Sequence, residues 1–130
     1  MSRSRLFREL MRSRVLVLDG SLGVRIQRSP ATAGGNVDML NITRPDVVAA
    51  VHRSYLDAGA DIIETNTFNS NAISQQEYAM EHRVEELNRR GVEIARAETQ
   101  RAERLDPSRP RFVAGSMGPT PVAASLTDEV

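Results

Sequence analysis

Three short apolar stretches, each followed at once by polar or glycine-rich residues, constrain the fold of this chain most. They read VLVL (15–18), ADII (60–63) and RFVA (111–114), and segments with helical periodicity separate them. Alternation of short strands with helices is typical of a parallel sheet with right-handed crossovers. We therefore expect an α/β fold with about three parallel strands and flanking helices.

The segments between the strands carry helix start and stop signals. An amphipathic helix is expected over residues 1–14. A second helix is expected to begin after Thr43 as its N-cap, with Pro45 in its first turn, and to end at Gly59. Its apolar face is predicted to contain Val47, Val51 and Tyr55. A third helical stretch covers about 73–105, with a break near Glu81.

Three strands do not complete either of the common parallel α/β architectures. A doubly wound sheet normally contains more strands, and an eight-stranded barrel typically needs about 250 residues. We therefore divide the chain into a lead-in helix (1–14) and one α/β domain (15–130), and we expect this domain to be the front part of a larger one, truncated at its C-terminus.

The overall charge and the absence of cysteine exclude several functions. The 17 basic residues balance the 17 acidic ones, so no net field attracts nucleic acid or anionic lipid. No apolar run approaches the roughly 20 residues that span a bilayer, and we expect a cytoplasmic protein without membrane or nucleic-acid partners. Because the chain has no cysteine, it cannot form disulfides, thiol nucleophiles or thiolate metal sites.

Chemistry-bearing residues follow the predicted strands. The first strand is followed by Asp19-Gly20-Ser21-Leu22-Gly23, the second by Glu64 and then Asn66-Thr67-Phe68, and the third by the glycine-rich segment 115–120. Since the carboxyl ends of parallel strands meet at one edge, these residues are predicted to form a pocket. At the opposite edge, Arg14, Asp61 and Arg111 are expected to be ordinary solvated residues.

Phosphate and metal sites are poor explanations of the turn after the first strand. The stretch Gly20 to Gly23 gives only G-x-x-G rather than a dinucleotide fingerprint, and a Gly-Lys-Ser/Thr phosphate loop is absent. A phosphatase of the haloacid-dehalogenase type needs an aspartate nucleophile where Val17 stands. Asp19, Glu64, His52 and His82 do not have the spacing of a metal motif, so no metal ligands and no catalytic residues are assigned.

The remaining interpretation of this turn is recognition of an amino acid. Asp19 would bind a cation, and the exposed backbone N–H groups after it would bind an anion. Two alternatives stay open, since Asp19 could merely cap the loop and Glu64 could bond backbone amides at the rim instead of touching a ligand.

Three segments resemble a known family. They are VLVLDGSLGVRIQ, NVDMLNITRPDVVAAVHRSYLDAGADIIETNTFNSN and RFVAGSMGPT, which together cover nearly the whole chain from Val15. They resemble the start of the homocysteine-binding module of cobalamin-dependent methionine synthase, a homocysteine S-methyltransferase. The resemblance implies that the chain is the N-terminal part of a (β/α)8 TIM barrel.

The same resemblance implies a substrate site. Homocysteine would bind at the C-terminal rim, its amino group at Asp19 and its carboxylate at the backbone of Gly20 to Gly23. Asn66, Thr67 and Phe68 would line the pocket. Zinc held by cysteine thiolates would activate the homocysteine thiol for attack on methylcobalamin. The zinc ligands, the second barrel half and the cobalamin and folate domains would lie outside this chain, which we expect to be inactive alone.

Two departures from the family pattern leave alternatives open. Val24 stands where the family usually has threonine, and the segment between Gln27 and Asn36 is short. The alternatives are a zinc-dependent methyltransferase that uses betaine or S-methylmethionine, and a non-catalytic α/β protein that binds an amino acid or a partner chain. A partner chain would cover the open sheet edge, which is otherwise prone to aggregation.

Overall fold

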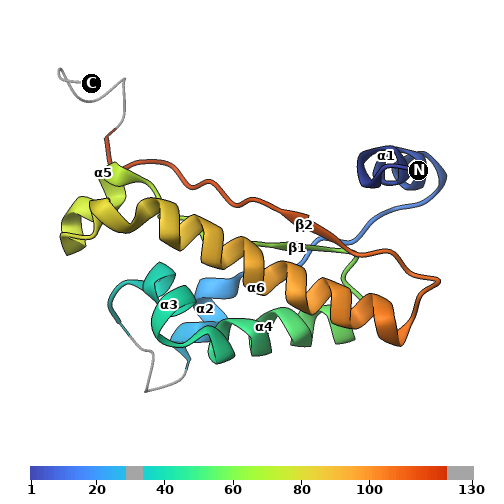
Figure 1. Cartoon of the computed structure of the whole chain (residues 1–130), viewed down its shortest axis with the longest axis horizontal. Helices are drawn as coiled ribbons and strands as arrows, with labels where there is room; N and C mark the ends of the chain where they lie inside the picture. Colours follow the sequence, from blue (N-terminus) through green and yellow to red (C-terminus); the bar gives the residue numbers. More distant parts are fainter. Residues whose placement is uncertain (29–33, 123–130) are drawn as a thin grey trace.

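A short parallel sheet lies at the centre of the molecule in a computed structural model that describes residues 1–28 and 34–122 (Figure 1). Strand β1 (Ile62–Glu64) pairs in parallel with β2 (Phe112–Ala114), with Ile62 opposite Phe112. On the other side of β1, Leu18 forms one parallel bridge with Ile62. The order in space is therefore the Leu18 segment, β1 and β2, which is the sequence order of the three predicted strands.

The first predicted strand is reduced to this single bridge. Asp61 and Ile62 donate their backbone N–H groups to Val17 O, and Asp19 N donates to Ile62 O. Val15 is 84% exposed, and no described strand pairs with the outer side of this segment. Only the end of this segment, at Leu18, forms a bridge with β1, so the expectation of three full strands was wrong.

Helices cover the two faces of the sheet unequally (Figure 1). The side chains of Ile63 and Val113 pack with helices α4 (Pro45–Asp57) and α6 (Val84–Leu105), which lie side by side on one face. Successive strand residues point to opposite faces, so Phe112 faces the other side. There it meets Phe7 of α1 (Arg3–Ser13) edge to face, with ring centroids 5.0 Å apart.

The remaining elements are short and lie around the ends of α4 and α6. They are α2 (Leu22–Gln27), the 3-10 helix η1 (Val37–Met39), α3 (Leu40–Thr43), α5 (Ala72–Gln75) and the 3-10 helices η2 (Gln76–Tyr78) and η3 (Glu81–Arg83).

The buried face of α4 is displaced by one residue from the expected one. Val48, His52 and Leu56 are at most 2% exposed, whereas Val47, Val51 and Tyr55 are only partly buried. The reason is that α4 has neighbours on two sides. Val47 and Val51 pack toward the Ile26 cluster of α2, while Leu56 packs into the cluster shared with α6 and the sheet.

The predicted helix boundaries are partly confirmed. Gly59 has φ +107° directly after the end of α4, a conformation that glycine adopts without strain. The break near Glu81 lies between η2 and η3, beside Ala79 at φ 54°. The N-cap assignment was wrong: Thr43 ends α3 and donates its hydroxyl to Met39 O, and Arg44 occupies the N-cap position.

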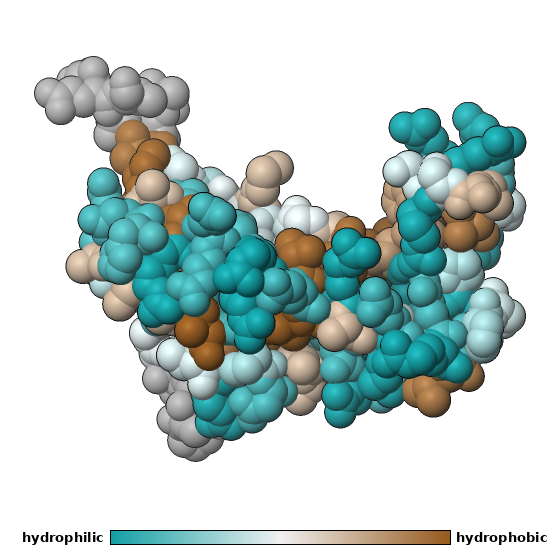
Figure 2. Space-filling model, viewed as in Figure 1, coloured by the Kyte–Doolittle hydropathy of each residue, from teal (hydrophilic) through white to brown (hydrophobic). Residues whose placement is uncertain are grey.

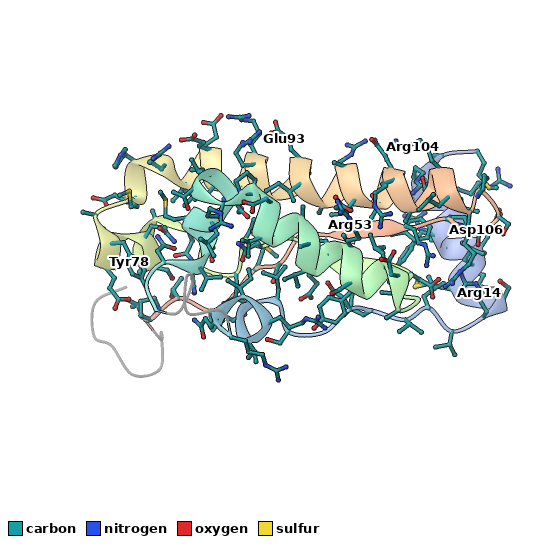
Figure 3. All side chains as sticks on the ribbon, turned by 90° about the horizontal axis from the view of Figure 1, so that it is seen from below. Arg14, Arg53, Tyr78, Glu93, Arg104 and Asp106 are labelled. Carbon is teal, nitrogen blue, oxygen red and sulfur yellow. The ribbon has the colours of Figure 1, made fainter. Side chains whose placement is uncertain are left out.

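At the edge where the strands begin, Asp61 and Arg111 are buried in a charge network, contrary to the prediction, whereas Arg14 is exposed as predicted. Asp61 is 1% exposed and accepts two hydrogen bonds of 3.0 Å from Arg14, one from Arg109 and one from Val17 N. Arg111 is 6% exposed and donates to Ala60 O. Figure 3 shows Arg14 and Asp106 at this end of the molecule and Tyr78 at the other.

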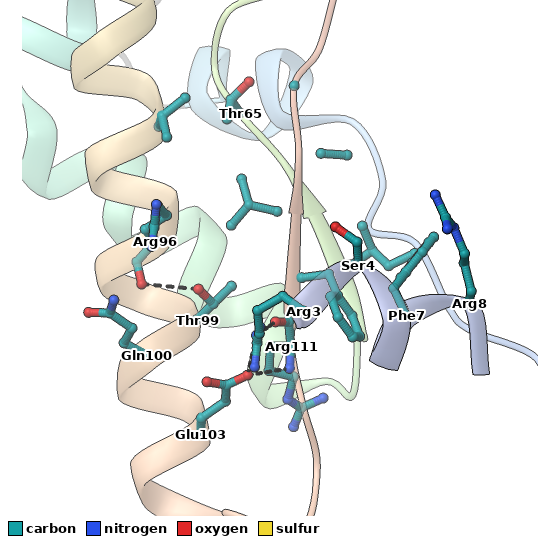
Figure 4. Close-up of a pocket in the computed structure, with 16 residues that line it drawn as sticks. Arg3, Ser4, Phe7, Arg8, Thr65, Arg96, Thr99, Gln100, Glu103 and Arg111 are labelled. Carbon is teal, nitrogen blue, oxygen red and sulfur yellow. Dashed lines mark hydrogen bonds and ion pairs between the residues drawn. The ribbon is translucent and has the colours of Figure 1, made fainter. Parts of the chain in front are cut away.

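The free edge of β2 opens onto a groove of about 900 Å³ between α1 and α6. The space-filling view shows the molecule hollowed beside α1, with hydrophobic residues on the floor of the hollow (Figure 2). Arg3 bridges the two walls through Glu103 and the carbonyl of Arg111 (Figure 4). No helix in the described residues is long and apolar enough to cross a membrane.

Candidate functional site

The ends of the three strand segments meet in one hydrogen-bonded rim, as predicted from their order. Asp19 Oδ2 accepts from Glu64 N at 3.1 Å, which joins the first segment to the second. Ser116 N donates to Thr65 Oγ1 at 3.0 Å and Gly118 N donates to Phe68 O at 2.9 Å, which join the second to the third. We call residues 19–23, 64–70 and 115–118 the strand-end rim.

Asp19 is a carboxylate of the rim with a buried oxygen that is not used in a hydrogen bond. Its Oδ1 is buried and has no hydrogen-bond partner in the described part of the chain. Burial raises the pKa of Asp19 to about 6; the bond from Glu64 N opposes this shift, and the nearby Glu64 charge adds to it. Burial disfavours the ionised form of Asp19, and a cation placed against Oδ1 would stabilise that form.

The turn after Asp19 is held from both sides. Ser21 caps α2 by accepting a hydrogen bond from Val24 N at 3.3 Å. Tyr55 of α4 donates its hydroxyl to Ser21 O at 2.9 Å. Leu22 packs against the Ile26 cluster, so its side chain belongs to the core and only its backbone is available to a ligand. Gly23 has open space where a Cβ would lie.

Glu64 is placed on the open face of the sheet. Because Ile63 points toward α4 and α6, the neighbouring Glu64 points to the opposite side. Its side chain is half-buried and forms no hydrogen bond or ion pair with residues 1–28 or 34–122. The rim therefore brings two carboxylates, Asp19 and Glu64, close together without a basic partner.

Asn66 and Thr67 are buried under the rim, whereas Phe68 is 51% exposed on it. Both protons of the Asn66 amide are donated internally, to Val37 O and Asn41 Oδ1 at 3.0 and 3.1 Å. Thr67 Oγ1 lies 2.7 Å from Thr65 Oγ1 and donates to Ser116 O at 2.8 Å. Asn66 and Thr67 therefore hold the shape of the rim, and Phe68 presents an aromatic side chain to its surface.

The segment just before α4 supplies supporting residues that sequence reasoning did not assign to the site. Asn41 is fully buried and donates to Asn66 O and Leu87 O at 2.7 and 3.1 Å. Asp38 accepts from Asn69 N at 3.0 Å and from Ser70 Oγ at 2.6 Å. The stretch VDMLN shows two polar residues among apolar ones, which marks both positions but does not indicate which groups they contact.

Two glycines allow close approaches beneath the rim. A Cβ on Gly118 would lie 2.5 Å from Phe68 O, and a Cβ on Gly91 of α6 would lie 2.7 Å from Thr67 Cγ2. Gly118, after β2, is therefore needed for packing against Phe68.

Comparison with known proteins identifies this arrangement. The model of the family described as homocysteine S-methyltransferase matches residues 16–129. The chain belongs to the homocysteine S-methyltransferase family. This confirms, at the level of the family, the resemblance predicted from the sequence motifs.

Two solved structures of a homocysteine methyltransferase, MmuM from Escherichia coli, share the fold. The metallated form has a TM-score of 0.72 at 23% identity, and the oxidized form has 0.73 at 24%. Each alignment covers 87% of this chain, but only 41% and 40% of the MmuM chain. The chain therefore spans about two fifths of the length of these structures and corresponds to part of their fold.

A zinc site does not fit this part of the homocysteine S-methyltransferase fold. The chain contains no cysteine, and the described residues contain no group of three or more His, Asp or Glu side chains placed to hold a metal ion. Soft thiolate ligands of the kind that zinc prefers are thus absent from the sequence. The described residues therefore do not supply the ligands of a zinc site.

The two histidines also lie away from the rim chemistry. His82 is exposed on η3, while His52 is fully buried between α4 and α6. Neither ring nitrogen of His52 has a hydrogen-bond partner among the described residues. Burial lowers the pKa of His52 to about 4, and the charge of Glu98 partly opposes this shift.

His52 is expected to make the fold sensitive to acid. Because its pKa falls from 6.5 to about 4 on folding, the unfolded chain takes up the proton first. The contribution of His52 is therefore unperturbed above pH 6.5 and destabilises the fold by on the order of 3 kcal/mol as the pH falls toward 4, while the raised pKa of Asp19 acts in the opposite direction over the same range. His52→Leu should therefore lose less stability than the wild type in urea unfolding measured from pH 7 to 4, and His82→Leu should follow the wild type. An unchanged loss in His52→Leu would assign the acid sensitivity to other groups.

Proposed function

We propose that the strand-end rim binds the amino-acid end of homocysteine in a protein that methylates the homocysteine thiol to give methionine. The observation that carries this proposal is the buried, unpartnered Oδ1 of Asp19 on the rim of a homocysteine S-methyltransferase fold. Asp19 would accept a charge-assisted hydrogen bond from the substrate ammonium group, and Glu64 would add negative charge beside it.

The other rim residues complete the proposed site. The backbone of Gly20 to Gly23 would bind the substrate carboxylate, and Phe68 would form an apolar wall beside the substrate side chain. Asn66 and Thr67 would act from beneath, because their polar groups are already used by Asn41 and Ser116. This arrangement would orient the substrate, and the group that activates its thiol would come from outside residues 1–130.

For the methyl donor we propose methylcobalamin, as in methionine synthase, on the basis of GADIIETNTFNS and GSMGPT. A zinc-dependent homocysteine methyltransferase with betaine or S-methylmethionine as donor is equally consistent with the family and with the likeness to MmuM. Assays of the complete protein with each donor distinguish the two, since each enzyme should form methionine with its own donor only.

We further propose that this chain works within a complete (β/α)8 barrel. The free edge of β2 beside the groove supports this, because Val113 points its backbone N–H and C=O away from β1 in a parallel ladder. A further parallel strand would satisfy these groups. Residues 1–130 alone are then inactive, and the rest of the barrel, with the zinc ligands, is the partner that activity requires.

Asp19→Asn in the complete protein is expected to weaken homocysteine binding by about 1.5–3 kcal/mol, or roughly 10- to 150-fold. The amide keeps the shape of the side chain but loses the charge that pairs with the ammonium group. In the wild type, affinity should rise as the pH passes about 6, where Asp19 becomes ionised. Isothermal titration calorimetry from pH 5 to 8 measures both effects.

Asp57→Asn is the matched control, since this exposed aspartate forms an ion pair with Arg101 on the helix layer. It should bind homocysteine like the wild type. The wild type, Asp19→Asn and Asp57→Asn could instead bind homocysteine equally well, without dependence on pH near 6. Asp19 would then only cap the loop and would not bind the substrate amino group.

A further inference from the structure

Tyr55 of α4 is the residue on which the contacts of the turn after Asp19 converge. The strand ladder ends at Asp19, whose N–H donates to Ile62 O. Gly20, Ser21 and Val24 beyond it are exposed, and within the turn it is the side chain of Leu22 that packs into the core. The hydroxyl of Tyr55 reaches it from the helix layer and donates to Ser21 O at 2.9 Å.

The ring of Tyr55 is itself well anchored. On one side it packs against the core cluster that contains Leu56 and Ile63. On the other, the guanidinium of Arg25, from α2, lies 5.0 Å from the ring centroid in a cation–π contact. The hydroxyl is therefore presented from a fixed ring.

Gly20 makes room for this hydroxyl. A Cβ at position 20 would lie 3.1 Å from Tyr55 Oη and 3.5 Å from Cε1, closer than side-chain carbons normally approach an oxygen. Gly20 has no positive φ that would by itself require glycine. The close approach of Tyr55 therefore favours glycine here, and it joins Tyr55 to the residue that follows Asp19.

We propose that Tyr55 is a positioning residue that holds the turn 20–23 in the conformation that receives the substrate carboxylate. This inference rests on the proposed function. Without the Tyr55 hydroxyl the turn samples other conformations and must be ordered when substrate binds, which costs affinity. The methyl transfer occurs at the thiol, at the opposite end of homocysteine. Loss of the Tyr55 hydroxyl should therefore raise KM for homocysteine and leave kcat nearly unchanged.

The test uses the complete protein with Tyr55→Phe, which removes the hydroxyl and keeps the ring. KM for homocysteine should rise about three- to tenfold, while kcat stays within about twofold. The thiol 3-aminopropane-1-thiol, which is homocysteine without its carboxylate, serves as a second substrate. With it, Tyr55→Phe and wild type should have the same KM, because the turn has no carboxylate to receive.

Tyr78→Phe is the matched control. It removes the hydroxyl of the other tyrosine in the chain, an exposed residue of η2 that forms no side-chain hydrogen bond with the described residues, and it should leave both constants unchanged. Gly20→Ala gives an independent perturbation, since its Cβ presses against Tyr55 Oη, and it should raise KM for homocysteine alone.

The outcomes separate this inference from the function on which it rests. A wild-type protein that neither binds nor methylates homocysteine overturns the proposed function. If the wild-type protein binds and methylates homocysteine, and Tyr55→Phe has the same KM for homocysteine as Tyr78→Phe, the role of Tyr55 is overturned. An equal rise of KM for both thiols, or a fall in kcat alone, would mean that Tyr55 only stabilises the fold. Either result also overturns its role in positioning the turn.

Discussion

Asp61→Ala is expected to lower the free energy of unfolding by about 2–4 kcal/mol. Asp61 accepts hydrogen bonds from Arg14, Arg109 and Val17 N and is 1% exposed. Breaking a fully buried ion pair costs about 3–5 kcal/mol. The lower figure allows for the two arginines, whose side chains are 38% and 40% exposed and can turn to water.

The pH dependence of this loss follows from the pKa of Asp61. The Arg14 guanidinium, with help from Val17 N and Arg109, holds this pKa far below its usual value near 3.8. A carboxyl group whose pKa is lowered by folding stabilises the fold above its unfolded pKa, and this contribution disappears as the pH falls through the folded pKa. The gap between wild type and Asp61→Ala should therefore be complete at pH 6 and narrow below pH 4.

Urea unfolding at several pH values measures the effect, with Asp57→Ala as the matched control. Asp57 also pairs with an arginine, but it is 62% exposed, and its loss should cost less than about 1 kcal/mol. If both variants unfold at the same urea concentration, the network around Asp61 does not stabilise the N-terminal ends of the strands.

The strand order and the rim were predictable because they depend on local patterns. Short apolar stretches that end in polar residues gave the sequence order of the three segments, and parallel pairing then requires their carboxyl ends to meet. Gly59 and the break near Glu81 were predictable for the same reason, since each depends on neighbouring residues alone.

What was missed depends on partners distant in sequence. Asp61 and Arg111 are charged residues of the kind usually found in solvent. Asp61 is buried because Arg14 and Arg109, which are distant in sequence, pair with it. The face of α4 shifted because two neighbours, α2 and α6, share it. Asn41 lies 25 positions from Asn66 and 46 from Leu87, so no local pattern indicates that it joins them.

The positions of the candidate site residues were predicted better than their contacts. The turn after Asp19 and the segment after β1 were correctly placed on one rim, because strand ends determine that placement. Sequence alone did not distinguish side chains that face a ligand from those that support the backbone. Asn66 and Thr67 use their polar groups internally, and Tyr55 reaches the rim from a helix that had been assigned only to packing.

Asn41→Leu is expected to cost about 3 kcal/mol of unfolding free energy and to weaken homocysteine binding as well. Leucine has the same branched outline but a larger volume; it leaves Asn66 O and one N–H of the Asn66 amide without a partner and removes the bond to Leu87 O. Each buried group left unsatisfied costs about 1–3 kcal/mol, and partial relaxation makes the sum smaller than the separate terms. Because Asn41 holds the backbone of Asn66, the rim between Glu64 and Phe68 should loosen before the whole domain unfolds.

Gln100→Leu is the matched control, since it exchanges an exposed amide on α6 for the same apolar side chain. Its unfolding free energy should stay within about 0.5 kcal/mol of the wild type. Hydrogen exchange of the Thr65–Asn69 amides should be faster in Asn41→Leu and unchanged in Gln100→Leu. Asn41→Leu could instead lose stability while these amides keep their protection. Asn41 would then stabilise the packing of α3 on α6 and would not hold the strand-end rim in shape.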